Sequence, residues 1–177
     1  MAFFVIQVRT GNEERCRLQA EKLLHPTRER LFWPRRSLRI RRQGQWRDSV
    51  APIFPGYLFL QAEELATEMY WRLKGLPGFQ RFLRDNMHIE PLGPRDRELL
   101  QHFLSFGEVL DRSTVSFDAD RRIRVISGPL KTLEGRIIKV DRRKGRARVR
   151  LELYEDAFLI DFGFDAIESL PAGPPGG

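Results

Sequence analysis

Apolar residues in the first half of the chain form two nearly continuous runs, and amphipathic segments separate and follow them. Residues 3–8 and 53–60 are apolar at almost every position, as expected for strands covered on both faces. Pro55 fits only near the start of its strand, because proline lacks a backbone donor. Three further segments carry apolar residues at helical spacing, and they cover residues 13–24, 63–74 and 94–106. With a short strand at residues 79–84, the pattern predicts an α+β fold, an α/β sandwich whose helices pack on a mostly antiparallel sheet.

Arginine dominates the segment between the two apolar runs. Apolar residues alternate with arginines over residues 35–42, which predicts a strand with one charged face. The Gln-Gly pair at residues 43–44 suits a two-residue hairpin turn, and residues 45–50 form the returning strand. Residues 28–47 hold eight arginines and a single acid. This density favours a surface for a polyanion, while a solvated edge strand protected by its charge is the alternative.

Beyond residue 106 the pattern changes to short strands. Residues 107–120 show no clear period and are rich in Asp, Ser and Thr, which indicates a flexible linker. Four apolar segments follow at close spacing and predict a small β-barrel. The expected strands cover residues 123–126, 136–140, 147–153 and 158–162. Residues 171–177 have the composition of a disordered tail, so we expect domains at residues 1–106 and 121–170.

Composition and charge narrow the function classes. The chain of 177 residues has a formal net charge of +7, and only five of its 31 basic side chains are lysine. Arginine presents a planar fork that suits phosphates and base edges, although an arginine-rich genome would give the same bias. The single cysteine, Cys16, excludes an internal disulfide and a cysteine metal cluster, and its helical spacing predicts a buried thiol. No apolar run is long enough for a membrane span, which predicts a soluble cytoplasmic protein.

The sequence lacks the motifs of common catalytic sites. The three histidines are scattered, with His25 beside Pro26 and His102 inside a helical pattern. We find no Gly-rich phosphate loop, no His-Glu-x-x-His helix and no Ser nucleophile elbow. Acidic residues are dispersed among arginines rather than clustered for metal binding. We therefore predict no catalytic residue, no metal site, no cofactor and no enzymatic activity.

Two separate groups of motifs resemble one family of transcription factors. The first strand and the corner at residues 54–58 are similar to the amino-terminal (NGN) domain of NusG-type elongation factors. Residues 123–168 look like a KOW domain. The residues that carry this second resemblance are Gly128, Pro129, Leu130, Lys131, Glu134, Gly135, Val140, Asp141, Ile167 and Glu168. Within the family, residues 32–36 and 128–131 most resemble the LoaP-type specialised antiterminators.

The resemblance implies that RNA polymerase is a partner. In the family, the amino-terminal domain seats on the clamp of the largest subunit, which keeps the clamp closed and suppresses pausing and termination. Family contacts with the clamp are mainly apolar, and by position they fall on Phe4, Phe54, Tyr57 and Tyr70. A place in the core is the alternative for each of these aromatic residues. The KOW domain would reach a further partner, which is RNA, a ribosomal protein or a termination factor.

Two arginine-rich segments form the expected RNA surface. Arg146, Arg148 and Arg150 alternate with apolar residues, so their guanidinium groups would share one face of a strand and could follow a phosphate backbone. A solvated face paired with Glu152 and Asp161 is the alternative. We predict that this segment, residues 139–150, and the arginine-rich hairpin of residues 35–47 together contact a hairpin in the nascent leader RNA. The expected RNA-binding residues are Arg35, Arg36, Arg39, Arg41, Arg42, Lys131, Arg142, Arg143, Lys144, Arg146 and Arg148.

The sequence is also compatible with two other functions. One is a housekeeping NusG-like factor that couples polymerase to the ribosome or to a termination factor. The other is a ribosomal or RNA-binding KOW protein without polymerase contact. Thr132 stands where many KOW sequences have glycine, and Glu155 and Asp156 replace a usual Gly-Arg pair, so the chain departs from the housekeeping pattern in these loops. We expect the protein to act as a monomer.

Overall fold

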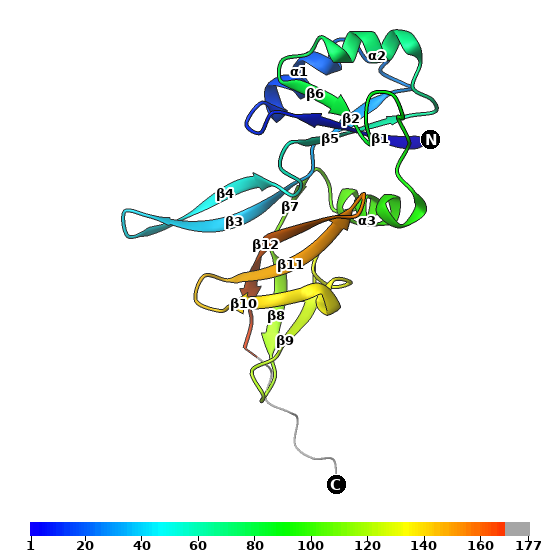
Figure 1. Ribbon diagram of the computed structural model, residues 1–177. Helices are drawn as coiled ribbons and strands as arrows, with labels where there is room; N and C mark the ends of the chain where they lie inside the picture. Colours follow the sequence, from blue (N-terminus) through cyan, green and yellow to red (C-terminus); the bar gives the residue numbers. More distant parts are fainter. Residues whose placement is uncertain (169–177) are drawn as a thin grey trace. The chain divides into compact units, whose positions relative to one another are not determined.

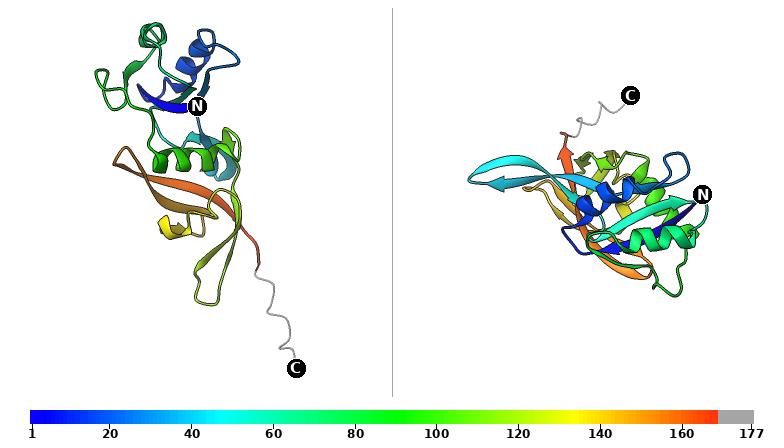
Figure 2. Two further views of the ribbon diagram at one scale, coloured as in Figure 1. Left: turned by 90° about the vertical axis from the view of Figure 1, so that its right-hand side faces the viewer. Right: turned by 90° about the horizontal axis from the view of Figure 1, so that it is seen from above.

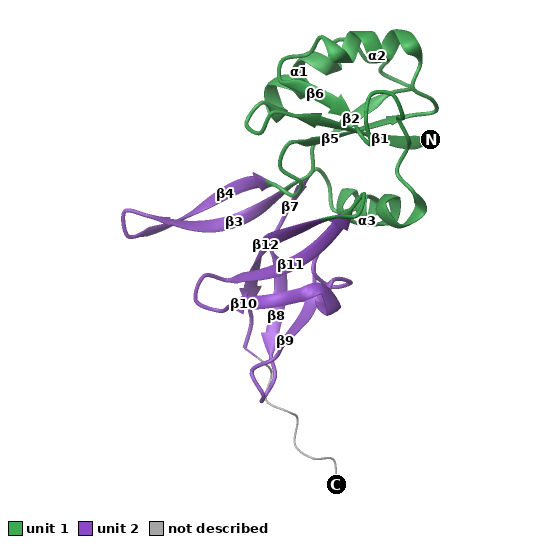
Figure 3. Cartoon of the chain, in the orientation of Figure 1, with its two compact units in different colours: residues 1–35, 52–108, 153–156 green, residues 36–51, 109–152, 157–177 purple. Residues whose placement is uncertain are grey.

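The computed structural model describes residues 1–168, and the tail expected at residues 171–177 lies outside the described residues. The chain divides into two compact units (Figure 3). Unit 1 contains residues 1–35, 52–108 and 153–156, and the described part of unit 2 contains residues 36–51, 109–152 and 157–168. Each unit is assembled from three separate parts of the chain, so the compact units cut across the division expected from the sequence.

A four-stranded sheet forms the centre of unit 1. Its strands are β1 (Ala2–Val8), β2 (Arg30–Phe32), β5 (Tyr57–Ala62) and β6 (Phe79–Phe82), in the order β2-β5-β1-β6. The two expected apolar runs become neighbouring antiparallel strands, with Ala2 opposite Ala62. One face of the sheet carries α1 (Glu13–Glu21) and α2 (Thr67–Lys74), and the other carries α3 (Pro94–Leu104) (Figure 1, Figure 2). This architecture confirms the predicted α+β class.

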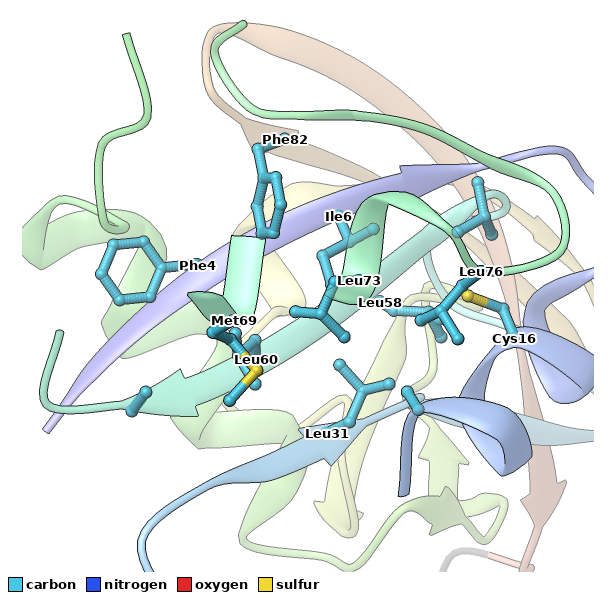
Figure 4. Close-up of a cluster of buried hydrophobic side chains, with 13 residues drawn as sticks. Phe4, Ile6, Cys16, Leu31, Leu58, Leu60, Met69, Leu73, Leu76 and Phe82 are labelled. Carbon is cyan, nitrogen blue, oxygen red and sulfur yellow. The ribbon is translucent and has the colours of Figure 1, made fainter. Parts of the chain in front are cut away.

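Apolar side chains cover both faces of this sheet. On the face below α1 and α2, Ile6 packs with Cys16 and Leu73 (Figure 4). Beneath α3, the ring centroid of Phe54 lies 6.2 Å from that of Phe103. Burial of one such large side chain stabilises a fold by about 1.5–3 kcal/mol. The predicted burial of Cys16 is confirmed, and burial raises the pKa of its thiol to about 11.

A buried carboxylate fixes the start of α1. Glu13 is 3% exposed, and its carboxylate accepts hydrogen bonds from the backbone N–H groups of Gly11 at 2.6 Å and Gly56 at 2.9 Å. Gly56 has a φ of +82°, and a Cβ there would lie 3.0 Å from the carbonyl oxygen of Val8, so the corner before β5 requires glycine. Thr10 and Glu13 have the spacing of a capping box, but the N-cap residue of α1 is Asn12 and the Glu13 carboxylate accepts from Gly11 and Gly56 instead.

All three helices are shorter than the sequence pattern predicted, and α3 ends at Leu104 rather than at residue 106. α1 ends at Glu21 rather than near residue 24, and α2 begins at Thr67 rather than at residue 63. Leu23 still packs against the core, from a turn in which its N–H donates to the Ala20 carbonyl oxygen. The apolar spacing therefore predicted the buried face but not the helix ends. None of the helices within residues 1–168 is long and apolar enough to span a bilayer.

A five-stranded sheet forms the larger part of unit 2. Its strands are β8 (Ser113–Phe117), β9 (Ile123–Ser127), β10 (Ile137–Asp141), β11 (Arg146–Leu153) and β12 (Asp156–Ala166), and the 3-10 helix η1 (Glu134–Arg136) precedes β10. The strand order is β10-β11-β12-β8-β9, with β8 parallel to β12. Val115, Leu130 and Val149 are fully buried in its small interior. The four strands predicted for the carboxy-terminal domain are confirmed, and β8 is a fifth.

The segment expected as a linker contains two strands. It includes β7 (Val109–Leu110) and all of β8. Ser113, Val115 and Phe117 are buried, whereas Thr114 and Ser116 between them are partly exposed. Because serine occupies an inward position, the alternation of a strand is hard to see in the sequence. The structure therefore differs from the expected linker at residues 109–110 and 113–117.

The arginine-rich hairpin forms as expected. β3 (Arg35–Arg42) and β4 (Gln45–Pro52) join β7 in a three-stranded sheet of order β4-β3-β7. Gln43 and Gly44 have φ values of +49° and +78°, as a two-residue hairpin turn requires. Residues 36–51 belong to unit 2, so the hairpin arginines that follow Arg35 share a compact unit with the five-stranded sheet.

Candidate nucleic-acid interface

Three of the four residues expected to contact polymerase lie in the interior of unit 1. Phe4, Phe54 and Tyr57 are 6%, 2% and 7% exposed. Phe4 belongs to the cluster below α1 and α2 (Figure 4), whereas Phe54 packs beneath α3. These positions agree with the core alternative, because strands that are apolar on both faces have both faces covered.

Tyr70, the fourth expected residue, keeps part of its surface accessible. Its ring stacks on Phe82 with centroids 5.6 Å apart and meets Trp71 edge-on at 5.3 Å. Trp71 is 62% exposed, and the ammonium group of Lys74 lies 4.9 Å from the centroid of its ring. Helix α2 thus presents an aromatic surface with a cation beside it.

The side chains of Arg35 and Arg36, the first two residues of β3, contact other groups of the protein. The Arg35 guanidinium lies 4.3 Å from the centroid of the Trp33 ring. Arg36 is 9% exposed, and its Nε donates a hydrogen bond of 2.5 Å to the carbonyl oxygen of Asp161. Burial lowers the pKa of Arg36 to about 10. This burial removes Arg36 from the expected RNA surface, because its guanidinium is enclosed by unit 2.

The arginines of β11 alternate with buried apolar residues, as predicted. Arg148 forms two hydrogen bonds with the Asp161 carboxylate, of 2.8 and 3.3 Å, and these bonds hold the pKa of Asp161 below its usual range. The Arg146 guanidinium lies 4.0 Å from the same carboxylate, and Arg150 lies 3.6 Å from Glu152. The arginines of β11 therefore match the alternative considered from the sequence, a solvated face whose arginines pair with Glu152 and Asp161.

The other expected RNA-binding residues are at the surface. Two of them contact their own unit, since Lys131 Nζ donates to the Ile126 carbonyl oxygen at 2.9 Å and the Arg142 guanidinium lies 4.2 Å from the Phe117 ring centroid. The exposed residues are Arg39, Arg41, Arg42, Lys131, Arg142, Arg143 and Lys144. Six of these seven exposed residues therefore belong to the β3–β4 hairpin or to the turn between β10 and β11.

The β3–β4 hairpin and the β10–β11 turn project on the same side of unit 2 (Figure 1, Figure 3). They line a common cavity of about 310 Å³, which we call the basic cavity. Its lining residues are Arg39, Trp46, Arg112, Arg142, Arg143, Lys144, Gly145, Phe164, Asp165 and Ala166. Arg146 ties β11 to the hairpin, because its Nη2 donates to the Arg39 carbonyl oxygen at 2.9 Å. The two segments predicted as an RNA surface thus meet in one site, where five cations face one carboxylate.

A family model described as the transcription termination factor NusG matches residues 1–101, more than half of the chain. The chain belongs to the NusG family. A second model, the KOW motif, matches residues 119–152 and covers β9, β10 and most of β11. Both resemblances noted in the sequence, to the NusG amino-terminal domain and to the KOW domain, are confirmed.

Several NusG proteins are similar to this chain over most of its length. The transcription termination/antitermination protein NusG of Thermus thermophilus is 23% identical over 180 residues, which cover 93% of this chain and 96% of that protein. The NusG of Helicobacter pylori is 20% identical and covers 96% of this chain and 99% of its own length. A solved structure, described as domain interaction in Thermotoga maritima NusG, matches with a TM-score of 0.60 at 17% identity, covering 92% of this chain and 93% of that one. This likeness supports the fold.

Trp46 and Arg112 are among the residues of the basic cavity that sequence reasoning missed in this NusG-family chain. Trp46 is 45% exposed on β4, and an exposed tryptophan among arginines was a signal that could have identified it. Arg112 lies between β7 and β8, where the sequence predicted a linker. Its guanidinium lies 2.8 Å from Asp48 and 3.1 Å from Asp165, contacts that join the hairpin to β12. Among residues 1–168, no three His, Cys, Asp or Glu side chains are grouped as ligands for a metal ion.

Proposed function

We propose that this protein is a transcription elongation factor of the antitermination type, which binds RNA polymerase through residues 1–106 and RNA through unit 2. The observation that carries the RNA part is the basic cavity, where cations from β3, β10–β11 and the β7–β8 connection gather around one carboxylate. Clustered arginine and lysine bind a phosphate backbone, because neutralised phosphates release their counterions. Membership of the NusG family supports the polymerase part.

The proposed polymerase partner is the clamp of the largest subunit. A factor bound there would keep the clamp closed and suppress pausing and termination. Of the four residues expected at this contact, Tyr70 is accessible beside the exposed Trp71, whereas Phe4, Phe54 and Tyr57 would support the surface from the interior. Tyr70→Ala is expected to weaken binding to purified polymerase, with Glu68→Gln on the same helix as the control. Equal affinity of both variants would remove Tyr70 from the contact.

We further infer a LoaP-type specialised factor that acts as a cytoplasmic monomer and recognises a hairpin in the nascent leader RNA. The resemblance at residues 32–36 and 128–131 supports this subtype. The exposed arginines on both the hairpin and the β10–β11 turn suit a structured RNA that spans them. A housekeeping NusG-like factor, which reaches a ribosomal protein or termination factor through its KOW domain, is the second candidate, favoured by the names of the relatives. A KOW-type ribosomal or RNA-binding protein without polymerase contact is the third.

Terminator read-through by purified polymerase tests the choice between these functions. We expect the protein to increase read-through on a template whose transcript carries the cognate leader hairpin, and not on one with a scrambled leader. Selection of bound RNA from a leader library would supply the cognate hairpin. Equal read-through on both templates would favour the housekeeping function, and RNA binding without polymerase binding would favour the third candidate.

A further inference from the structure

We propose that the basic cavity holds one unpaired nucleotide of a bound RNA, with its base stacked on Trp46 and its phosphate bound by Arg143 and Lys144. This proposal rests on the proposed RNA binding by unit 2 and names the feature of the RNA that unit 2 recognises. It assigns a binding role to Trp46, a residue outside the arginine-rich surface expected from the sequence.

The position of Trp46 suits base stacking. The residue lies on β4, is 45% exposed and lines the cavity beside Arg39 and Arg142. A tryptophan ring left in water on a hairpin contributes little to a core, whereas its face is a stacking surface for any nucleobase. The paired bases of a duplex are already stacked on one another, so the proposed occupant is a base outside the duplex.

The cations of the cavity divide into two groups. In the first group, Arg112 is bound by Asp48 and Asp165, and the Arg39 guanidinium lies 3.6 Å from Asp165. Arg142 belongs to this group too, because its guanidinium lies 4.2 Å from the centroid of the Phe117 ring. In contrast, the side chains of Arg143 and Lys144 are exposed and form no ion pair within the described part of the chain. The first group builds the wall of the cavity, and the second group supplies the charge that a phosphate would neutralise.

Backbone contacts hold the turn that carries these two cations. The Lys144 N–H donates to the Asp141 carboxylate at 2.9 Å, and the Phe164 N–H donates to the Gly145 carbonyl oxygen at 2.9 Å. A Cβ on Gly145 would lie 2.8 Å from the Phe164 carbonyl oxygen, so the turn rests directly on β12. An anchored turn loses little conformational freedom on binding, which favours affinity.

The size and charge of the cavity limit its occupant. Its volume of about 310 Å³ lies at the lower end of the range for small-molecule sites, roughly 300–1,000 Å³, and suits one nucleotide rather than a duplex. Asp165 is the one carboxylate in the lining. It disfavours a second phosphate beside it, and it can accept a hydrogen bond from an amino group of the base.

Binding of two short RNA hairpins to the full-length protein tests the proposal. One hairpin carries a single unpaired 2-aminopurine nucleotide, and the other is the same hairpin without it. We expect the first to bind more tightly and its fluorescence to be quenched on binding. Trp46→Ala should weaken binding of the bulged hairpin about 5-fold to 150-fold and remove the quenching, as for the loss of one stacked base. Val50→Ala, which truncates another exposed apolar residue of β4, is the matched control.

The outcomes separate this proposal from RNA binding in general. If Trp46→Ala binds the bulged hairpin as tightly as the unaltered protein and quenches it equally, the proposed stacking is wrong while RNA binding by unit 2 stands. If the unaltered protein binds both hairpins equally, the affinity comes from charge alone and the single-nucleotide site is wrong. Absence of binding to any RNA would instead overturn the proposed function. Thermal unfolding of each variant verifies that the exposed substitutions leave the fold intact.

Discussion

The sheet of unit 1 and the strands of unit 2 use side chains in opposite ways. β1 and β5 are buried on both faces, whereas β11 alternates buried apolar residues with arginines. As a result, aromatic residues that resemble a docking surface in the first sheet are part of its core. In unit 2 the outward positions are available for charge, and the hairpin adds an exposed tryptophan. Position on a one-sided strand is therefore a better guide to the accessibility of a residue than its chemical type.

Truncation of Phe54 should give the largest effect. It tests whether this aromatic residue of unit 1 belongs to the core. Phe54→Ala removes a ring that packs against Phe59 and Phe103, and we expect a loss of about 3–5 kcal/mol in the free energy of unfolding. Chemical denaturation measures this loss. Trp71→Ala, at an exposed aromatic residue of the same unit, should change stability by less than about 0.5 kcal/mol. Similar losses in both variants would contradict the assignment of Phe54 to the core.

Removal of the Glu13 carboxylate should have the next largest effect on unit 1. Glu13→Ala leaves the N–H groups of Gly11 and Gly56 without their acceptor, which should cost about 2–3 kcal/mol. Glu13→Gln keeps one acceptor oxygen and should lose less. Glu14→Ala, in the exposed position beside it, is the control. An unfolding free energy unchanged by Glu13→Ala would show that the two glycine contacts contribute nothing measurable.

A salt series compares the exposed cations of the β10–β11 turn, Arg143 and Lys144, with the paired arginines of β11, Arg146 and Arg148. Arg143→Ala/Lys144→Ala should lower the slope of log affinity against log salt by about 1.4–1.8, because each lost phosphate contact removes roughly 0.7–0.9. Arg146→Ala/Arg148→Ala should lower the slope less, since Asp161 already pairs with both guanidinium groups. RNA affinity measured by fluorescence anisotropy gives both slopes. A larger change of the slope in the second variant would instead indicate that Arg146 and Arg148 of β11 contact the RNA phosphates.

Acidification should produce the smallest effect. Hydrogen bonds from Arg148 lower the pKa of Asp161 in the folded protein, so its contribution to stability is present above the ordinary aspartate pKa and is lost as pH falls through the lowered value. Asp161→Asn should therefore cost about 1 kcal/mol or less near neutral pH and reduce the loss of stability below about pH 4. Urea unfolding at several pH values measures both changes. Asp111→Asn, at an exposed residue, is the control, and identical pH profiles for both variants would contradict the role of Asp161.

The sequence predicted features that depend on local pattern. It predicted β1, β5, the Gln43–Gly44 turn and four of the five strands in the carboxy-terminal sheet, because periodicity and turn residues are local signals. β8 was missed because Ser113 occupies an inward position. The spacing of Thr10 and Glu13 suggests only a local cap, because the second partner of Glu13, Gly56, is 43 residues away.

The candidate site was predicted only in part, and for a related reason. Charge density correctly indicated the hairpin and the β10–β11 turn as exposed cationic segments. The burial of Arg36 and the pairing of Arg148 with Asp161 depend on β12, which the hairpin sequence alone does not reveal. Trp46 and Lys144 line the same cavity because segments that are distant along the chain pack together, which the sequence does not reveal either.

The bond between Glu13 and Gly56 also constrains the order in which the protein can fold. During synthesis, residues 1–50 leave the ribosome before Gly56 is available, so the Glu13 carboxylate first emerges into water without its distant donor. α1 has nine residues and is too short to be stable alone. Its final structure therefore requires the pairing of β1 and β5, because that pairing brings Gly56 to the Glu13 carboxylate.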